Sequence, residues 1–270
     1  MKEKDVFIIT NDFYPSRGGI QECMLGLAKN FNGRTTVLAP YYSGYKISDD
    51  KRFDLDIIRT NSLRQDRFID RLLCLFLRRP LIFLLRTFFE IYRITRYRSY
   101  SFTLCGNITN IPIGIFLKYV KKFPLGAVVH GRELFFRGLL KSFKDSAARF
   151  LLRRTDFVFM SNSFMKQKVI EMGIPEKKIV MISFGVSWAQ SLKIKEGGIE
   201  RKKKIILTVG RLIERKGHNI VIEALPIILR RFPDIMYQIV GKGPMEKGLK
   251  ELVKEKDLCK YVEFCGEVEN

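Results

Sequence analysis

Short apolar runs alternate with amphipathic segments along almost the whole chain, and this alternation limits the fold more than any other feature. Runs such as Val6–Thr10 and Leu125–His130 have the length of buried strands, whereas Ile20–Phe31 and His218–Arg231 have helical spacing. Strands that alternate with helices predict a mainly parallel sheet that is covered on both faces. Further strands are expected at Thr35–Ala39, Ile57–Thr60, Ser101–Cys105, Phe157–Ser161, Ile179–Ile182, Ile205–Gly210, Tyr237–Gly241 and Tyr261–Cys265.

A polar stretch divides this pattern in two. Residues 187–204 contain a glycine pair and the basic run Arg201–Lys204, which is typical of a linker between domains. We therefore predict an α/β chain with a complete Rossmann-like domain at 1–186, a linker at 187–204 and a second Rossmann-like domain at 205–270. The second domain would hold three strands and two helices, which is half of a doubly wound sheet, so we expect it to be truncated.

The net charge and the numbers of cysteine and histidine residues limit the classes of function that the chain can have. The net charge of +21 suits nucleic acid, anionic lipid or phosphorylated small molecules as partners. The five cysteines include no Cys-x-x-Cys pair, and there are two histidines, so neither a disulfide framework nor a metal site is expected. The apolar run Val6–Ile9 is too short for a signal peptide, and we predict a cytoplasmic protein.

The segment Leu63–Arg98 is unlike the rest of the chain. It combines nine arginines and three acids with many leucine and phenylalanine residues, and Pro80 interrupts its apolar run. The run is shorter than the roughly 20 residues that span a bilayer. Two interpretations stay open: helices that pack on the sheet with arginines exposed, or a segment that lies on an anionic membrane surface.

The loop after the strand at Ile205–Gly210 is the first candidate for chemistry. Arg211 and Lys216 lie on it, and ligands of open α/β sheets bind where strands end. Arginine offers a planar fork to phosphate and lysine a compact charge, so the pair suits a diphosphate. The alternative is two solvated surface cations.

Two further candidates lie in the first domain. Gly18 and Gly19 follow the first strand and precede a helix, where glycines let backbone N–H groups approach a ligand. His130 lies just past a strand end and is followed by Gly131. The alternatives are a tight turn without ligand and a structural histidine.

A glycine-rich turn occurs once more, at Gly241-Lys242-Gly243. A dinucleotide fingerprint would have a third glycine where this chain has Glu246, which argues against an NAD-binding domain. The alternative to a ligand-binding role is an ordinary turn between strand and helix.

The order and spacing of these pieces resemble the retaining GT-B glycosyltransferases of family 4. In the second domain the resemblance rests on Gly210-Arg211-Leu212, Lys216-Gly217, Glu223-Ala224-Leu225, Ile239–Pro244 and Val262–Gly266. The first domain adds Pro15 with Gly18-Gly19, His130-Gly131, Ser161-Asn162-Ser163 and Gly173-Ile174-Pro175.

The resemblance implies roles for the candidate residues. Arg211 and Lys216, together with Gly18 and Gly19, would bind the diphosphate of a nucleotide sugar. His130 would line the cleft at the reacting centre. Gly241 and Gly243 would lie on the nucleotide side. The donor would be the nucleotide diphosphate sugar itself, with no cofactor and no metal.

The implied activity is transfer of a hexosyl group to a hydroxyl acceptor with retention of configuration. The segment Leu63–Arg98 suits a lipid-linked or cell-envelope acceptor and an enzyme peripheral to the inner face of the cell membrane.

The chain departs from the family at two places. It has Phe184-Gly185-Val186-Ser187 where the family commonly has Asn-Gly-Val-Asp, and the Glu-x7-Glu element expected after Gly266 is absent. A catalytically inactive remnant or interaction module of the same fold is therefore one alternative. A basic nucleic-acid-binding protein is the second, although no nucleic-acid-binding motif is present and no specific nucleic acid is expected.

Overall fold

The computed structural model describes residues 5–16, 18–63, 88–134, 141–183 and 204–268. The chain divides into two compact units, Met1–Leu192 and Lys193–Asn270, and each is described by itself. The division falls inside the predicted linker at 187–204, of which only Lys204 is described. Most of Leu63–Arg98 and the whole of Phe184–Ser187 also lie outside the described residues.

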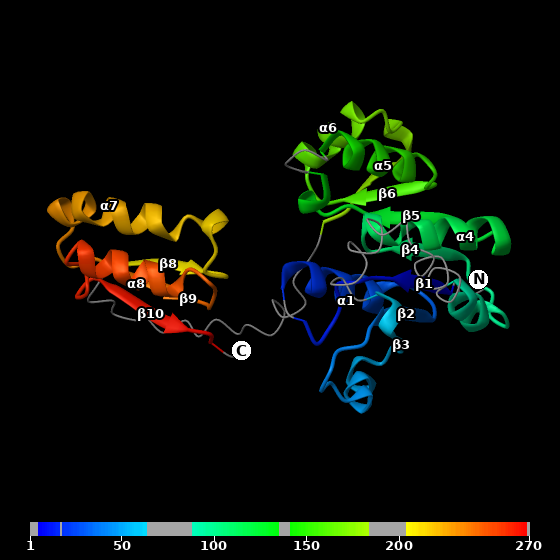
Figure 1. Cartoon of the computed structure of the whole chain (residues 1–270), viewed down its shortest axis with the longest axis horizontal. Coiled ribbons are helices and arrows are strands. Elements are labelled where there is room, and N and C mark those ends of the chain that lie inside the picture. The colour runs from blue at the N-terminus through cyan, green and yellow to red at the C-terminus, as the bar shows by residue number, and fades with distance from the viewer. Residues whose placement is uncertain (1–4, 17, 64–87, 135–140, 184–203, 269–270) are drawn as a thin grey trace, which may run out of the picture. The chain divides into compact units, whose positions relative to one another are not determined.

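The first unit is built on a seven-stranded parallel sheet of order β3-β2-β1-β4-β5-β6-β7, and Figure 1 shows the labelled strands following one another in this order. Every neighbouring pair is parallel, with Ile8 of β1 opposite Val37 on one side and Leu104 on the other. The strands are β1 (Val6–Ile9), β2 (Thr35–Pro40), β3 (Asp56–Thr60), β4 (Phe102–Cys105), β5 (Leu125–Val128), β6 (Phe157–Met160) and β7 (Ile179–Met181).

Helices connect these strands. They are α1 (Gly19–Asn30), α4 (Ile111–Lys121), α5 (Lys141–Arg153) and α6 (Ser163–Glu171), and residues 88–95 are also helical. The short 3₁₀ helices are η1 (Ile47–Phe53), η2 (Asn61–Leu63), η3 (Ile108–Asn110), η4 (Gly131–Leu134) and η5 (Glu176–Lys178).

Alternate residues of the central strand face opposite layers. Ile8 packs with Met24 of α1, whereas Phe7 and Ile9 pack with Ile91 and with α4. Because side chains of a strand alternate between the two faces, α1 covers one face of the sheet, and the helix at 88–95 and α4 cover the other. The core on β4 to β6 includes residues of both α4 and α5, so α5 lies on the same face as α4.

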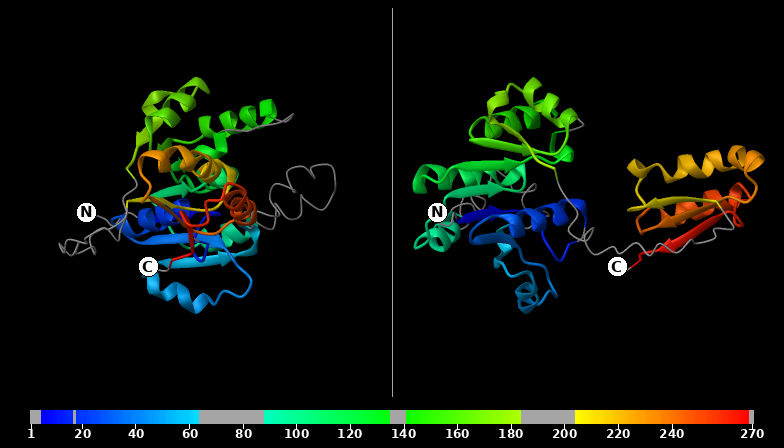
Figure 2. Two further views of the ribbon diagram at one scale, coloured as in Figure 1. Left: turned by 90° about the vertical axis from the view of Figure 1, so that its left-hand side faces the viewer. Right: turned by 180° about the vertical axis from the view of Figure 1, so that it is seen from behind.

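The second unit holds a three-stranded parallel sheet of order β10-β9-β8. Its strands are β8 (Ile205–Val209), β9 (Met236–Val240) and β10 (Val262–Gly266), and its helices are η7 (Glu214–Lys216), α7 (His218–Arg231) and α8 (Glu246–Glu255). Both α7 and α8 contribute to one apolar core with the strands, and the pair can be followed in Figure 2. Alternate residues of β8 (Ile205, Leu207 and Val209) are exposed on the other face.

The predicted strands and helices are confirmed to within one residue at each end, except that the strand expected at Leu125–His130 ends two residues earlier, as β5 at Leu125–Val128. In the part of the chain that the structure describes, no helix is long and apolar enough to cross a membrane.

Candidate functional site

Gly18 and Gly19 lie where the loop after β1 enters α1. Gly18 is the N-cap residue, and among the described residues no side chain caps this end of the helix. Both glycines are exposed, and a Cβ added to Gly19 would meet no atom within 4 Å. The first-turn N–H groups thus have no capping side chain at an exposed helix N-terminus, a position at which anions bind in other proteins.

Polar contacts hold the beginning of this loop. The Asp12 carboxylate accepts hydrogen bonds from Gln21 Nε2 of α1 at 2.9 Å and from Asn107 Nδ2 at 2.7 Å. Asn107 Oδ1 in turn accepts from the backbone N–H of Asn11 at 3.1 Å. Because Asn107 follows β4, this network ties the loop after β1 to the loop after the neighbouring strand.

His130 lies two residues past the end of β5 and is half-buried. Burial lowers the pKa of its imidazole, while the charge of Asp12 and a hydrogen bond with the backbone of Gly106 act in the opposite direction. Because burial dominates, the imidazole is neutral near pH 7, a form in which one ring nitrogen donates and the other accepts.

These residues share one edge of the sheet. Gly18, Gly19 and His130 follow β1 and β5, and β4 lies between those two strands. The order of strands changes direction at β1, which has β2 on one side and β4 on the other. This is the switch point at whose carboxyl edge doubly wound sheets bind ligands. Asp12 lies close enough to His130 to influence its pKa.

In the second unit, Arg211 and Lys216 lie on the loop that follows β8. Both side chains are exposed, and the structure shows no hydrogen bond or ion pair of either one among the residues it describes. A Cβ added to Gly210 would meet Lys216 Cε at 3.5 Å and Nζ at 3.7 Å, so the lysine side chain folds back across the start of the loop. The two cations are thus available to an anion at the carboxyl end of a strand.

A buried polar chain supports this loop from beneath. His218 Nε2 lies 3.3 Å from the carbonyl oxygen of Arg211, and His218 Nδ1 lies 3.4 Å from the Tyr237 hydroxyl. The Tyr237 hydroxyl is 3.1 Å from Thr208 Oγ1. Since a carbonyl oxygen only accepts, Nε2 is the donor in the contact with Arg211. His218 is 1% exposed, so the backbone of Arg211 is anchored in the core.

Gly241 and Gly243 pack against the same loop. A Cβ added to Gly241 would lie 2.1 Å from the Gly210 carbonyl oxygen, and one added to Gly243 would lie 2.4 Å from that of Leu212. Backbone hydrogen bonds join the two loops, from Gly210 N to Val240 O at 2.9 Å and from Leu212 N to Lys242 O at 3.1 Å. Both glycines therefore permit close contact between two backbones, and their role on the nucleotide side stays a prediction.

The structure brings the predicted residues together in two groups, one in each unit. Sequence reasoning missed Asp12, Asn107 and Gln21 in the first group and the His218–Tyr237 pair in the second. The sequence could have indicated His218, because it directly follows Lys216-Gly217, a pair that was already a candidate. No group of three or more His, Cys, Asp or Glu residues that could hold a metal ion occurs among the described residues.

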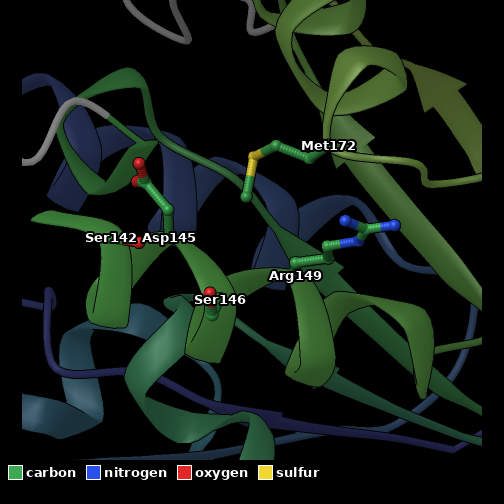
Figure 3. Close-up of a pocket in the computed structure, with 5 residues that line it drawn as sticks. All are labelled: Ser142, Asp145, Ser146, Arg149 and Met172. Carbon is green, nitrogen blue, oxygen red and sulfur yellow. The ribbon is translucent and has the colours of Figure 1, made fainter.

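A separate hollow of about 420 Å³ lies beside α5. It is lined by Ser142, Asp145, Ser146, Arg149 and Met172, as Figure 3 shows. Its lining includes none of the predicted site residues, and the arginine and both serines are exposed to solvent. The hollow is therefore a surface feature distinct from both groups.

Comparison with known proteins bears on the second group first. Residues 190–270 match the family model of glycosyl transferases group 1. This group 1 segment contains Arg211, Lys216, Gly241 and Gly243, so the four predicted residues of the second unit all lie inside the matched stretch.

Curated relatives with similar sequences are named as glycosyltransferases. The chain is 29% identical over 139 residues to the amylovoran biosynthesis glycosyltransferase AmsK of Erwinia amylovora, a match over 52% of this chain and 34% of AmsK. It is 27% identical over 146 residues to the putative colanic acid biosynthesis glycosyltransferase WcaL of Escherichia coli, over 53% of this chain and 34% of WcaL. Each match spans about a third of the relative's length.

Solved structures match almost the whole chain. HepE of Anabaena in complex with UDP aligns over 98% of this chain and 69% of its own, with a TM-score of 0.71 and 16% identity. A glycosyltransferase of Rickettsia africae aligns over 100% of this chain and 69% of its own, with a TM-score of 0.72 and 17% identity. The predicted α/β fold of GT-B type is confirmed by these neighbours.

Proposed function

We propose that this chain transfers a hexosyl group from a nucleotide diphosphate sugar to a hydroxyl acceptor of a cell-envelope glycan, with retention of configuration, as family 4 enzymes do. The observation that supports this most directly is the anchored loop after β8, which presents Arg211 and Lys216 to solvent at a strand end. The names of AmsK and WcaL support the envelope glycan, and HepE was captured with UDP and with UDP-glucose.

In the proposed reaction, the bond between the anomeric carbon and the diphosphate oxygen breaks. The acceptor hydroxyl forms its bond on the same face, and its proton passes to the departing diphosphate. Arg211 and Lys216 stabilise the negative charge that grows on the diphosphate, which lowers the barrier because the charge is larger in the transition state. On the first unit, the N–H groups at Gly18 and Gly19 would offer further donors to a diphosphate, and on the second unit Gly241 and Gly243 would lie on the nucleotide side.

His130 would contact the donor sugar as a neutral imidazole. The Asp12–Asn107 network would hold the surrounding loops in position, because a catalytic group is effective only in a fixed geometry. The residues present need neither a metal nor a cofactor for this step. We place the reaction in the cytoplasm, which fits the free thiols of the four described cysteines.

The test compares Arg211→Ala with Arg215→Ala, because Arg215 is an exposed arginine on the same loop. UDP binding is measured by calorimetry, and turnover by UDP release from UDP-glucose with water or glycan acceptors. We expect Arg211→Ala to weaken UDP binding and to slow turnover by roughly 10²–10³, as for loss of one charge-stabilising donor. Arg215→Ala should leave both within about twofold.

Three results would contradict the proposal in different ways. Equal effects of the two substitutions would remove Arg211 from the site. UDP binding without any sugar transfer would favour an interaction module of this fold. Salt-sensitive binding of duplex DNA with no affinity for UDP would favour a nucleic-acid-binding protein.

A further inference from the structure

The helix at 88–95, α4, α5 and α6 lie on one face of the sheet of the first unit, and the first three present an unusual outer surface. The helix at 88–95, α4 and α5 bury their apolar sides on this face: the ring centres of Phe88 and of Phe116 on α4 lie 4.9 Å apart, and Ile111 of α4 shares a core with Leu152 of α5. Their outer sides form what we call the basic face. It is defined by the exposed residues Phe89, Tyr92, Arg93, Arg96, Tyr97, Tyr119, Val120, Lys122, Phe143, Lys144, Arg149, Phe150, Arg153 and Arg154.

The charge on the basic face has one sign. Within 88–98, 111–122 and 142–154, every fully exposed charged side chain is a lysine or an arginine. The two acids in these ranges, Glu90 and Asp145, are half-buried. Glu90 accepts hydrogen bonds from Thr60 Oγ1 at 3.1 Å, so it points toward the body of the unit.

The other helices that the structure describes do not share this property, and these include α6, which lies on the same face of the sheet. On α8 the lysines pair with acids, with Lys250 Nζ at 2.7 Å from Glu246 and Lys247 Nζ at 4.0 Å from Glu251. On α6, Lys166 Nζ lies 2.5 Å from Glu176. The single sign on the basic face is therefore local and does not simply reflect the net charge of +21.

Large apolar side chains stand among these cations. Tyr97 is 84% exposed, Phe89 is 69% exposed and Phe143 is 65% exposed. Three cations lie over rings: the Arg154 guanidinium is 4.0 Å from the Phe150 ring centre, the Arg96 guanidinium is 4.9 Å from that of Tyr97, and the Lys121 ammonium is 5.1 Å from that of Tyr92. Aromatic rings interleaved with lysine and arginine are typical of surfaces that lie in the headgroup region of a bilayer.

We propose that the basic face docks on a bilayer that contains anionic lipid. The cations would approach lipid phosphates, at about 1 kcal/mol each, and the rings would enter the headgroup layer. The helices of the basic face cover one face of the sheet. Their outer surface therefore lies beside the carboxyl edge of the sheet and does not cover it. A docked bilayer would therefore leave the edge with Gly18, Gly19 and His130 open. This proposal rests on the surface alone and holds whether or not the chain transfers sugar.

The test is co-sedimentation of the chain with vesicles of pure phosphatidylcholine and with vesicles that contain about one third phosphatidylglycerol. We expect binding to the anionic vesicles that weakens as salt is raised from 0.05 to about 0.5 M, because the Debye length shrinks. The variant Arg93→Gln/Arg96→Gln/Arg153→Gln should lower the partition coefficient about 100-fold, at roughly a factor of five for each cation. The control is a triple variant on α8 that removes the same charge, Lys247→Gln/Lys250→Gln/Lys254→Gln. It should change the partition coefficient less than about threefold.

A second pair of variants tests the aromatic part. Phe143→Ser/Phe150→Ser should lower the partition coefficient about tenfold with the salt dependence retained, because apolar burial is not screened. Ile220→Ser/Ile227→Ser, which changes two exposed side chains of α7, should have no effect.

Equal losses in the variant and its α8 control would overturn the proposal, since binding would then depend on net charge alone. Absence of binding to anionic vesicles at low salt would also overturn it. So would tighter binding to duplex DNA that the same three arginines control, because the surface would then belong to a nucleic acid. Circular dichroism of each variant establishes that the fold is retained.

Discussion

Arg59 on β3 offers a sharp test of how the loop before Gly18 is held. Its side chain is 1% exposed, and it pairs with Asp50 of η1, which is 7% exposed. Nε and Nη2 donate to the carboxylate at 2.9 and 2.5 Å, and Nη1 donates to the carbonyl oxygens of Tyr14 at 2.6 Å and Pro40 at 3.2 Å. One buried guanidinium therefore joins η1, β2 and the loop after β1.

Replacing this arginine by an apolar residue of similar length, Arg59→Met, leaves the Asp50 carboxylate buried. Its remaining hydrogen bond comes from the Tyr45 hydroxyl at 2.7 Å. Breaking a buried pair by removing one partner costs about 3–5 kcal/mol, because the other charge stays desolvated without compensation. For a unit of this size the midpoint of thermal unfolding should fall by roughly 6–20 °C. The double variant Arg59→Met/Asp50→Leu should cost much less, since it removes both charges.

The free energy of unfolding of the three variants and the parent chain can be measured in urea by circular dichroism. Hydrogen exchange in peptides from β1, β2 and β3 assigns the loss to the first unit. If Arg59→Met costs less than about 1 kcal/mol, or if the double variant is the less stable one, the buried pair is not what holds these loops. Because Nη1 also binds the Tyr14 carbonyl oxygen, the double variant should recover stability but bind UDP more weakly than the parent.

The other predictions concern Gly241 and His130. Gly241→Ala places a Cβ at 2.1 Å from the Gly210 carbonyl oxygen at a φ of +132°, and should destabilise the second unit by about 2–5 kcal/mol. Gly248→Ala, in α8 with nothing within 4 Å, should instead stabilise it by about 0.5–1 kcal/mol in urea unfolding. Burial lowers the pKa of His130 below its ordinary value of 6.5, so the unfolded chain takes up more protons as the pH falls below that value. Its contribution to stability is therefore lost on acidification, at no more than about 1.4 kcal/mol per pH unit, and His130→Gln should show a shallower fall than the parent from pH 7 to 5.

Periodicity predicted the fold because it records burial directly. The central strands β1 and β5 are apolar and buried at all four positions, as expected for a parallel sheet between two layers. The helix at His218–Arg231 was predicted with its observed bounds although Pro226 lies inside it. Hydrogen bonds within turns explain why some observed strands end earlier than predicted. Thr10 was expected in the first strand, but its hydroxyl accepts from the N–H of Asp12 at 3.0 Å, so the chain turns there.

The polar networks of the site could not be predicted, because their members are distant in sequence. Asp12 and Asn107 are 95 positions apart and meet only because β1 and β4 are neighbours. His218 and Tyr237 are 19 positions apart, on a helix and on the next strand. No local pattern distinguishes such residues from solvated ones. The strand order, which decides which loops meet, comes from packing of the whole unit.

A residue that the fold itself requires is weak evidence for a ligand site, whereas a charged residue that the fold does not use is stronger evidence. Gly241 and Gly243 would be needed for contact with Gly210 and Leu212 even if no nucleotide ever bound, so their presence is weak support for a nucleotide site. Arg211 and Lys216 are exposed, and the described structure assigns their charges no partner. The fold uses neither cation, although the core holds their loop in place. A bound anion would give both charges a partner, which is why the proposed function depends on the cations and not on the glycines.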